Sequence, residues 1–188
     1  MRNLTRERVE PFRFISETES ILKANGLLLC SMGKDKKPNL MTIGWGLIGT
    51  MWRQPFFVVA VRFSRYTYKL LEESGEFTVC LPSEGMEKVL EFCGTRSGRD
   101  LDKFKELGLT PMKGSNVEVP FITECPIHYE CRVAYKVSIE PGGLDADLEK
   151  EVYPSGDYHT IYFGQIKGVY AEKNAPGRLL KTDLLKKD

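Results

Sequence analysis

The segment CPIHYECRVAYKVSIE, residues 125–140, has the clearest periodicity in the chain. Apolar side chains occupy every second position from Ile127 to Ile139, and mostly polar side chains lie between them. Side chains of a β-strand point alternately to its two faces, so this pattern predicts one long strand with a single buried face. The segment HTIYFGQIKGVYAE, residues 159–172, predicts another long strand. Long antiparallel strands are therefore the expected frame of the fold.

Further strands are predicted earlier in the sequence. LLLCSM (27–32) and EFTVCLP (76–82) are short and apolar, and the continuous apolar run 56–61 is typical of a central strand covered on both faces. LMTIGWGLIGTMW (40–52) predicts one long strand bent at its glycines, which Pro55 ends. These strands would join those formed by the two long segments.

Short helices are expected between the strands, where apolar residues recur at helical spacing and glycines follow. They are SETESILKANG (16–26), TYKLLEESG (67–75), EGMEKVLEFCG (84–94) and SGRDLDKFKELG (97–108). The polar, turn-rich segment 140–157 is expected to form an exposed loop. Strand-rich chains with a few inserted helices close most economically into a barrel, so we predict a six- or seven-stranded barrel with helices at its rim, in one domain over residues 1–188.

The bulk composition excludes several classes of function. The 27 basic residues nearly balance the 26 acidic ones, which disfavours a nucleic-acid partner. Neither a signal-peptide core nor an apolar run of membrane-spanning length is found, so we expect a cytoplasmic protein. There are five cysteines without a Cys-x-x-Cys pair and only two histidines, which predicts free, buried thiols and no metal site. The cysteines are Cys30, Cys80, Cys93, Cys125 and Cys131.

A polar segment, RFSRYT (62–67), follows the apolar strand and precedes a predicted helix. Hydroxyl groups, guanidinium groups and free backbone N–H groups would meet there at a helix N-terminus, which suits a phosphate. The alternative is that Ser64 or Thr67 only caps the helix and that Arg65 is solvated. Both interpretations remain open from these residues alone.

Two more segments carry candidate binding residues. Arg99 and Lys103 lie four residues apart and would share a helix face, where they could add charge to the same anion unless neighbouring aspartates neutralise them. Asn39, Thr42 and Trp45 could supply hydrogen bonds and an aromatic surface to a flat ligand. The alternative for Trp45 is a place in the core.

In their order along the chain, four motifs resemble the flavin reductase-like family and especially its flavoredoxin branch. The motifs are NLMTIGW (39–45), RYTYKLLEESGEF (65–77), CGTRSGRDLDKF (93–104) and GDYHTIYFGQI (156–166), within a similar region of about residues 26–170. The resemblance implies a mainly β fold with short helices, an FMN-binding split β-barrel. It also implies a homodimer that passes electrons between a reduced nicotinamide or protein donor and an acceptor.

The resemblance also implies where FMN would bind. By motif position, Asn39, Thr42 and Trp45 would lie around the isoalloxazine ring, Lys103 would add charge to the phosphate, and His159 would approach the flavin. The full set of predicted cofactor-binding residues is Asn39, Thr42, Trp45, Arg62, Ser64, Tyr66, Thr67, Lys103 and His159.

The expected function is hydride transfer from NADH or NADPH to FMN, with electrons passed on to an acceptor. No Gly-x-Gly-x-x-Gly follows a strand, so the nicotinamide would bind only transiently. We expect no catalytic side chain, because the flavin supplies the chemistry itself. The alternatives are a flavoredoxin-type electron carrier that holds FMN tightly and exchanges electrons with a redox protein, and a non-redox binding module on the same barrel.

Overall fold

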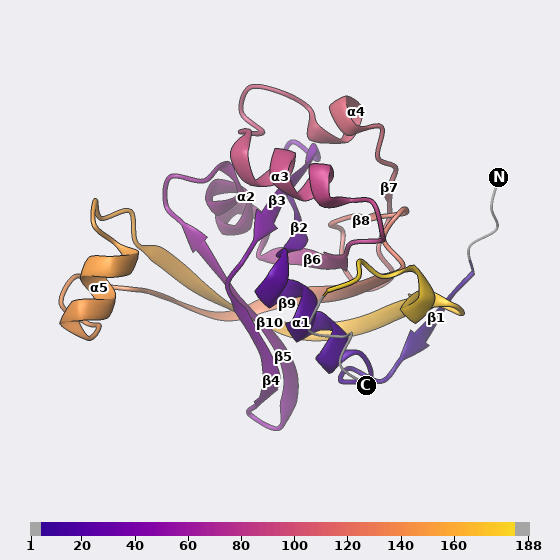
Figure 1. The fold of residues 1–188 in the computed structure, drawn as a ribbon, viewed down its shortest axis with the longest axis horizontal. Helices are drawn as coiled ribbons and strands as arrows, with labels where there is room; N and C mark the ends of the chain where they lie inside the picture. The colour runs from indigo at the N-terminus through magenta and orange to yellow at the C-terminus, as the bar shows by residue number, and fades with distance from the viewer. Residues whose placement is uncertain (1–4, 183–188) are drawn as a thin grey trace.

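The computed structural model describes residues 5–182, and one large sheet runs through them (Figure 1). The strands are β1 Arg6–Val9, β2 Leu27–Met32, β3 Pro38–Ile43, β4 Gly46–Met51, β5 Gln54–Arg62, β6 Glu76–Leu81, β7 Pro111–Met112, β8 Phe121–Ile122, β9 Ile127–Ser138 and β10 His159–Glu172. The helices are α1 Ile15–Ala24, α2 Tyr66–Ser74, α3 Glu87–Thr95, α4 Lys103–Leu107, α5 Ala146–Val152 and the 3₁₀-helix η1 Ala175–Arg178. No helix of residues 5–182 is both long and apolar enough to span a membrane.

The main sheet has eight strands, in the order β3-β2-β6-β9-β10-β5-β4, with β1 also paired to β10. All of its ladders are antiparallel, and β7 and β8 form a separate small pair. Within residues 5–182 no ladder joins the edge strands β3 and β4, so the sheet is not closed. The predicted count of six or seven strands was therefore wrong, because the short strand β1 adds to the sheet and residues 40–52 form two strands.

Residues 40–52 form two strands at opposite ends of the sheet rather than one bent strand. Between them, Gly44 and Trp45 leave the strand conformation. The carbonyl of Trp45 accepts a hydrogen bond from the Ala60 N–H at 3.3 Å, which turns the chain from β3 toward β5. This crossing brings the end of β3 close to β5 and opens the space that becomes the candidate site.

The long predicted strands are confirmed as β9 and β10, whose ladder is the longest in the sheet. Only the first half of β9 lies in the core, where Ile127–Cys131 is buried on both faces. In the second half, Tyr135 is 52% exposed and Val137 is 44% exposed. The predicted single buried face is therefore wrong, because the outer half of β9 runs beyond the elements that cover its inner half (Figure 1).

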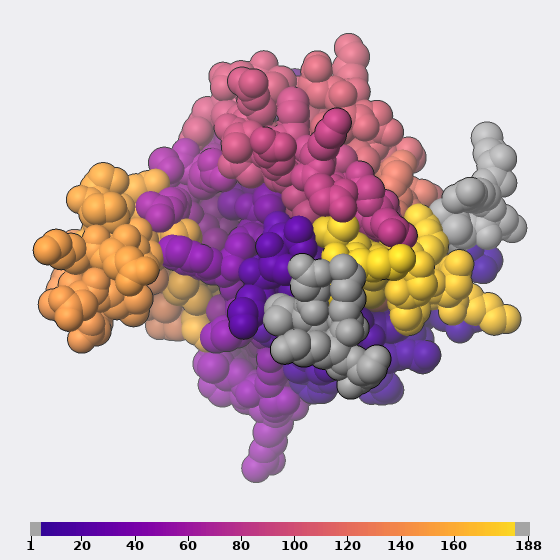
Figure 2. Space-filling view, viewed as in Figure 1, coloured from indigo at the N-terminus to yellow at the C-terminus, as the bar shows by residue number. Residues whose placement is uncertain are grey.

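The predicted loop 140–157 contains a helix, α5, and projects from the body at the end of the β9–β10 hairpin (Figure 2). Asp145 caps it by accepting hydrogen bonds from the N–H groups of Asp147 and Leu148. The polar, turn-rich composition of this segment predicted an exposed loop without a helix, which is wrong because Asp145 provides a good N-cap.

The helices predicted at 16–26, 67–75 and 84–94 are confirmed as α1, α2 and α3, and α3 packs on β2 and β3. The helix predicted at 97–108 begins later, at Lys103, because Asp102 is its N-cap and accepts hydrogen bonds from the N–H groups of Phe104 and Lys105. All five cysteines are free and buried, as predicted. They belong to the hydrophobic core, and the polar residues of the candidate site lie at the ends of β3 and β5.

Candidate functional site

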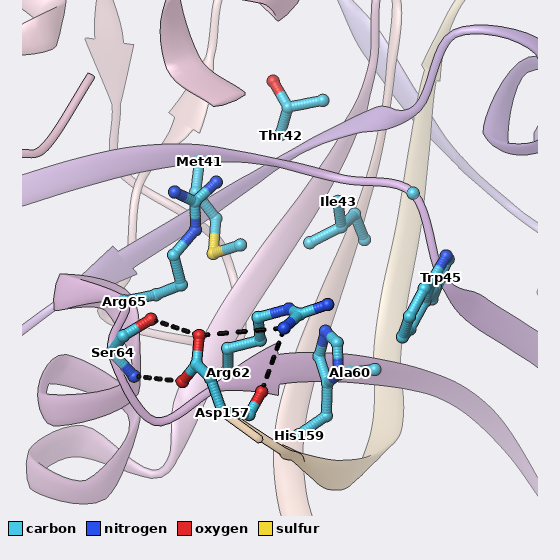
Figure 3. A pocket seen from close by; sticks show the side chains of 11 residues that line it. Met41, Thr42, Ile43, Trp45, Ala60, Arg62, Ser64, Arg65, Asp157 and His159 are labelled. Atoms are coloured by element: carbon cyan, nitrogen blue, oxygen red, sulfur yellow. Dashed lines mark hydrogen bonds and ion pairs between the residues drawn. The ribbon is translucent and has the colours of Figure 1, made fainter. Parts of the chain in front are cut away.

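Two adjoining cavities lie between the end of β3, the end of β5 and the N-terminus of α2. The larger has a volume of about 460 Å³ and is bordered by Trp45, Arg62 and His159 (Figure 3). The smaller has a volume of about 130 Å³ and is bordered by the first turn of α2 and by Lys103. Both cavities are lined by Met41, Ser64 and Arg65, so together they form one continuous site.

The N-terminus of α2 opens into the smaller cavity. Its N-cap residue is Arg65, and within residues 5–182 no side chain caps the helix. The hydroxyl of Ser64 instead donates to Asp157 at 2.7 Å. The interpretation of Ser64 or Thr67 as a simple helix cap is therefore wrong, and the first N–H groups of α2 can bind an anion.

Thr67 and Asn39 form a buried pair beside this helix end. The side-chain amide of Asn39 donates to Thr67 Oγ1 at 3.0 Å. Since that contact uses the oxygen of Thr67 as an acceptor, the hydroxyl hydrogen of Thr67 remains available to a ligand. The pair joins β3 to α2 and fixes the direction of this donor.

Lys103 is a buried cation in the wall of the smaller cavity, with only 4% of its surface exposed. Its ammonium group donates to the carbonyls of Leu40 at 2.7 Å and Cys93 at 2.9 Å. Burial lowers the pKa of Lys103. An ammonium group has three donors, so one N–H remains for a ligand.

Arg99 connects the segment 97–108 to the polar segment 62–67. Its guanidinium group donates to the Ser64 carbonyl at 3.0 Å and lies over the Tyr66 ring, 5.5 Å from the ring centroid. The two segments therefore lie side by side, although Arg99 precedes α4 and the predicted helix face shared with Lys103 is wrong. The smaller cavity is thus lined by positive charge and hydrogen-bond donors.

The aromatic rings of Trp45 and His159 and the guanidinium group of Arg62 form one side of the larger cavity. Trp45 is 43% exposed, so its interpretation as a core residue is wrong. Its ring lies 4.4 Å from that of His159 and 5.9 Å from the Arg62 guanidinium carbon. Burial lowers the pKa of His159 to about 4, and the charge of Arg62 adds to this effect. His159 is therefore neutral at pH 7.

The side chain of Thr42 points away from Arg62 and His159, although its residue lines the cavity (Figure 3). Its hydroxyl donates to the Leu90 carbonyl of α3 at 2.5 Å. The alternation of side chains along β3 explains this, because Met41 and Ile43 occupy the opposite face. Thr42 thus ties β3 to α3, and only its backbone is available to a ligand in this arrangement.

Asp157 is a site residue that the sequence reasoning missed. Its carboxylate accepts hydrogen bonds from the backbone N–H and the hydroxyl of Ser64, at 3.2 and 2.7 Å, and lies 3.8 Å from Arg62. Its backbone φ of +57° is in the left-handed region. The motif GDYH contains Asp157, but nothing local indicated that it would connect the start of β10 to the turn before α2.

Comparisons with known proteins identify the fold and the family. Residues 23–183 match the family model described as "Flavin reductase like domain". Flavoredoxin of Desulfovibrio vulgaris has a TM-score of 0.66 and 27% identity, over 86% of this chain and 78% of its own. An FMN-binding domain of a flavin reductases-like enzyme from Shewanella baltica has a TM-score of 0.64 and 16% identity, over 90% and 78%. These likenesses confirm the predicted fold class, a mainly β split barrel with short helices.

An uncharacterized protein of Archaeoglobus fulgidus is 34% identical over 131 residues, which cover 70% of this chain. The chain spans 64% of the length of that relative. The match to the family model extends over most of the described residues and includes both cavities. The chain belongs to the flavin reductase-like family.

Proposed function

We propose that the chain binds FMN across the two cavities and acts in electron transfer. The observation that carries this proposal is the convergence of free donors on the smaller cavity. These are one N–H of Lys103, the hydroxyl of Thr67 and the first N–H groups of α2. A phosphate group fits such a set of donors, since it offers several acceptor oxygens and a negative charge.

The larger cavity would take the isoalloxazine ring, and bound FMN would supply the redox chemistry. Trp45, Arg62 and His159, which border this cavity, would lie beside the ring. Met41 contributes to both cavities and would contact the ligand between ring and phosphate. The protein side chains would therefore bind and orient the cofactor and exclude water from one side of it.

An equilibrium titration of the apo-protein with FMN tests this function. The absorption band and the fluorescence of the flavin report binding, and we expect saturation at one FMN per chain. If a sample shown to be folded by circular dichroism binds no FMN, the proposal is wrong. A non-redox binding module would then become the better interpretation.

The electron donor is proposed to be NADH or NADPH, and the alternative is a reduced redox protein. The exposed ring of Trp45 supports a site that a small donor can reach. Anaerobic mixing of the FMN-loaded protein with NADH or NADPH should bleach the flavin band within seconds to minutes. Bleaching only by a reduced ferredoxin-type protein would favour the electron carrier.

The cytoplasmic location and the single domain over residues 1–188 stay predictions.

Replacement of Trp45 by alanine should change the flavin environment. We expect the Trp45→Ala protein to bind FMN about fivefold more weakly, because an aromatic contact contributes about 1 kcal/mol. Its bound-flavin absorption band should also shift relative to that of the wild type. Met112→Ala is the control, since Met112 is also an exposed apolar residue but lies on β7, outside both cavities. If the spectrum of the variant at saturating FMN equals that of the wild type, Trp45 does not contact the flavin ring.

We also propose that the chain forms a homodimer. Tyr135 and Val137 on the outer half of β9 and Trp52 at the β4–β5 turn are exposed apolar residues, and the rings of Trp52 and Tyr135 lie 6.4 Å apart. Exposed apolar groups that gather in this way support a protein interface. Sedimentation velocity should give twice the 21.4 kDa mass of one chain. A monomer at micromolar concentration would contradict this proposal and leave FMN binding untouched.

A further inference from the structure

The projecting segment 140–157 reaches back to the larger cavity through one side chain. Tyr153 follows α5 directly and is buried, although most of its segment is exposed. Its hydroxyl lies 2.7 Å from His159 Nδ1. Tyr153 does not line the cavity itself, so it contacts His159 from behind.

This contact determines which nitrogen of His159 carries the proton. A neutral imidazole has one donor and one acceptor nitrogen. Burial raises the pKa of Tyr153, but a tyrosine hydroxyl is still a much stronger acid than a neutral imidazole N–H, so the stronger hydrogen bond has Tyr153 as donor and Nδ1 as acceptor. The proton of His159 then lies on Nε2. No hydrogen bond to Nε2 is found within residues 5–182, and His159 lines the larger cavity.

Several contacts hold Tyr153 in this position. Its ring stacks on Tyr158 at 4.6 Å, and the Tyr158 hydroxyl donates to Glu149 of α5. The Arg62 guanidinium carbon lies 5.4 Å from the Tyr153 ring centroid, and Arg62 also donates to the Val152 carbonyl at 3.4 Å. The end of α5 is thus attached to β5, and Tyr153 is oriented by groups on both sides.

The charged groups around His159 keep its ring neutral. Arg62 on β5 and Arg65 at the start of α2 disfavour a second positive charge, while Asp157 favours it. Burial is the largest cause of the lowered pKa of His159. Tyr153, Tyr158 and Glu149 are the titratable groups that α5 and its loop bring to this side. At pH 7 His159 is therefore a neutral ring whose hydrogen-bonding pattern depends on Tyr153.

We propose that Tyr153 is a positioning residue that fixes His159 in the neutral Nε2–H form, so that His159 offers a hydrogen-bond donor to the ligand in the larger cavity. The ligand edge that faces His159 must then carry an acceptor, a carbonyl oxygen or an unprotonated ring nitrogen. The identity of that ligand as FMN rests on the proposed function. The protonation state of His159 does not.

Nitrogen-15 NMR of the full chain labelled at histidine tests the proposal without any ligand. The sequence has only two histidines, and a His159→Gln variant assigns the signals. In the wild type at pH 7 we expect proton coupling to show Nε2 protonated and Nδ1 unprotonated. A protonated Nδ1 would overturn the proposal. Because this measurement is made on the wild-type protein, it does not depend on how well a variant folds.

The Tyr153→Phe variant then tests the role of the hydroxyl group. Loss of the donor should give a mixture of the two neutral forms and raise the pKa of His159, because the hydrogen bond to the neutral ring is gone, while burial and Arg62 still hold that pKa below its ordinary value. FMN should bind about threefold more weakly at pH 7. The pH at which the His159 signals titrate should also be higher than in the wild type, a change that a merely structural loss would not produce.

Tyr162→Phe is the matched control. It removes the hydroxyl of another buried tyrosine, which donates to Glu72 at 2.9 Å and does not contact His159. Its histidine spectrum should equal that of the wild type, and the same spectrum in Tyr153→Phe would overturn the proposal. If the chain binds no FMN while the histidine signals behave as expected, the proposed function fails and the positioning role stands.

Discussion

Lys103→Met should weaken FMN binding about thirtyfold at pH 7. A charge-assisted hydrogen bond contributes about 1.5–3 kcal/mol, or roughly a 10- to 150-fold change in the dissociation constant. The side chain of Lys103 is buried in the cavity wall, so water screens this contact less than it would at the surface. Methionine keeps the apolar stem and removes the charge. A flavin titration of both proteins at the same ionic strength measures the difference.

The control for Lys103→Met is Lys105→Met. Lys105 lies on the same helix and is exposed, so its replacement removes one positive charge without altering the cavity. Lys103→Met also leaves the Leu40 and Cys93 carbonyls without their donor, which should lower the free energy of unfolding by about 1–3 kcal/mol. The titration is therefore made well below the unfolding midpoint of each protein. If the two variants have equal dissociation constants for FMN, Lys103 does not bind the phosphate.

Gly164→Ala should lower the free energy of unfolding by about 3 kcal/mol, the upper end for overpacking a core. A Cβ on Gly164 would lie 2.6 Å from Phe77 Cε1 and 3.0 Å from Cys131 Cβ. Both neighbours are fully buried, and they pair with each other across β6 and β9. The ring of Phe77 cannot move aside without displacing other core residues.

Thermal unfolding measures this effect, and the midpoint should fall by roughly 6–12 °C for a chain of this size. Gly49→Ala is the matched control, because Gly49 also lies in a strand but a Cβ there meets nothing within 4 Å. Its midpoint should stay within about 2 °C of the wild type. A similar midpoint for Gly164→Ala would mean that the core between β6, β9 and β10 is looser than its packing indicates.

Much of the candidate site could be predicted, because each motif lies on a short continuous stretch. The segment 62–67 combines a strand end with a helix start, and both features are local. The spacing of Arg99 and Lys103 left their convergence on this helix end open, and the family resemblance placed Lys103 there. The resemblance placed Asn39 beside the ring, whereas Asn39 lies at the helix end, bonded to Thr67. The orientation of Thr42 toward α3 and the contact of Asp157 with Ser64 were missed, because each depends on a partner far away in the sequence.

The sequence by itself determined where most strands and helices form. Residues 159–172 fold as the predicted strand β10, and the alternating segment 125–140 contains β9, because side-chain periodicity acts within one strand. Only the tertiary structure decided which faces are covered. In that structure Tyr135 is exposed, and the two halves of 40–52 form strands at opposite edges of the sheet. The hydroxyl of Tyr153 also contacts the ring of His159. Burial and pairing depend on which distant segments pack together, and a local pattern does not contain that information.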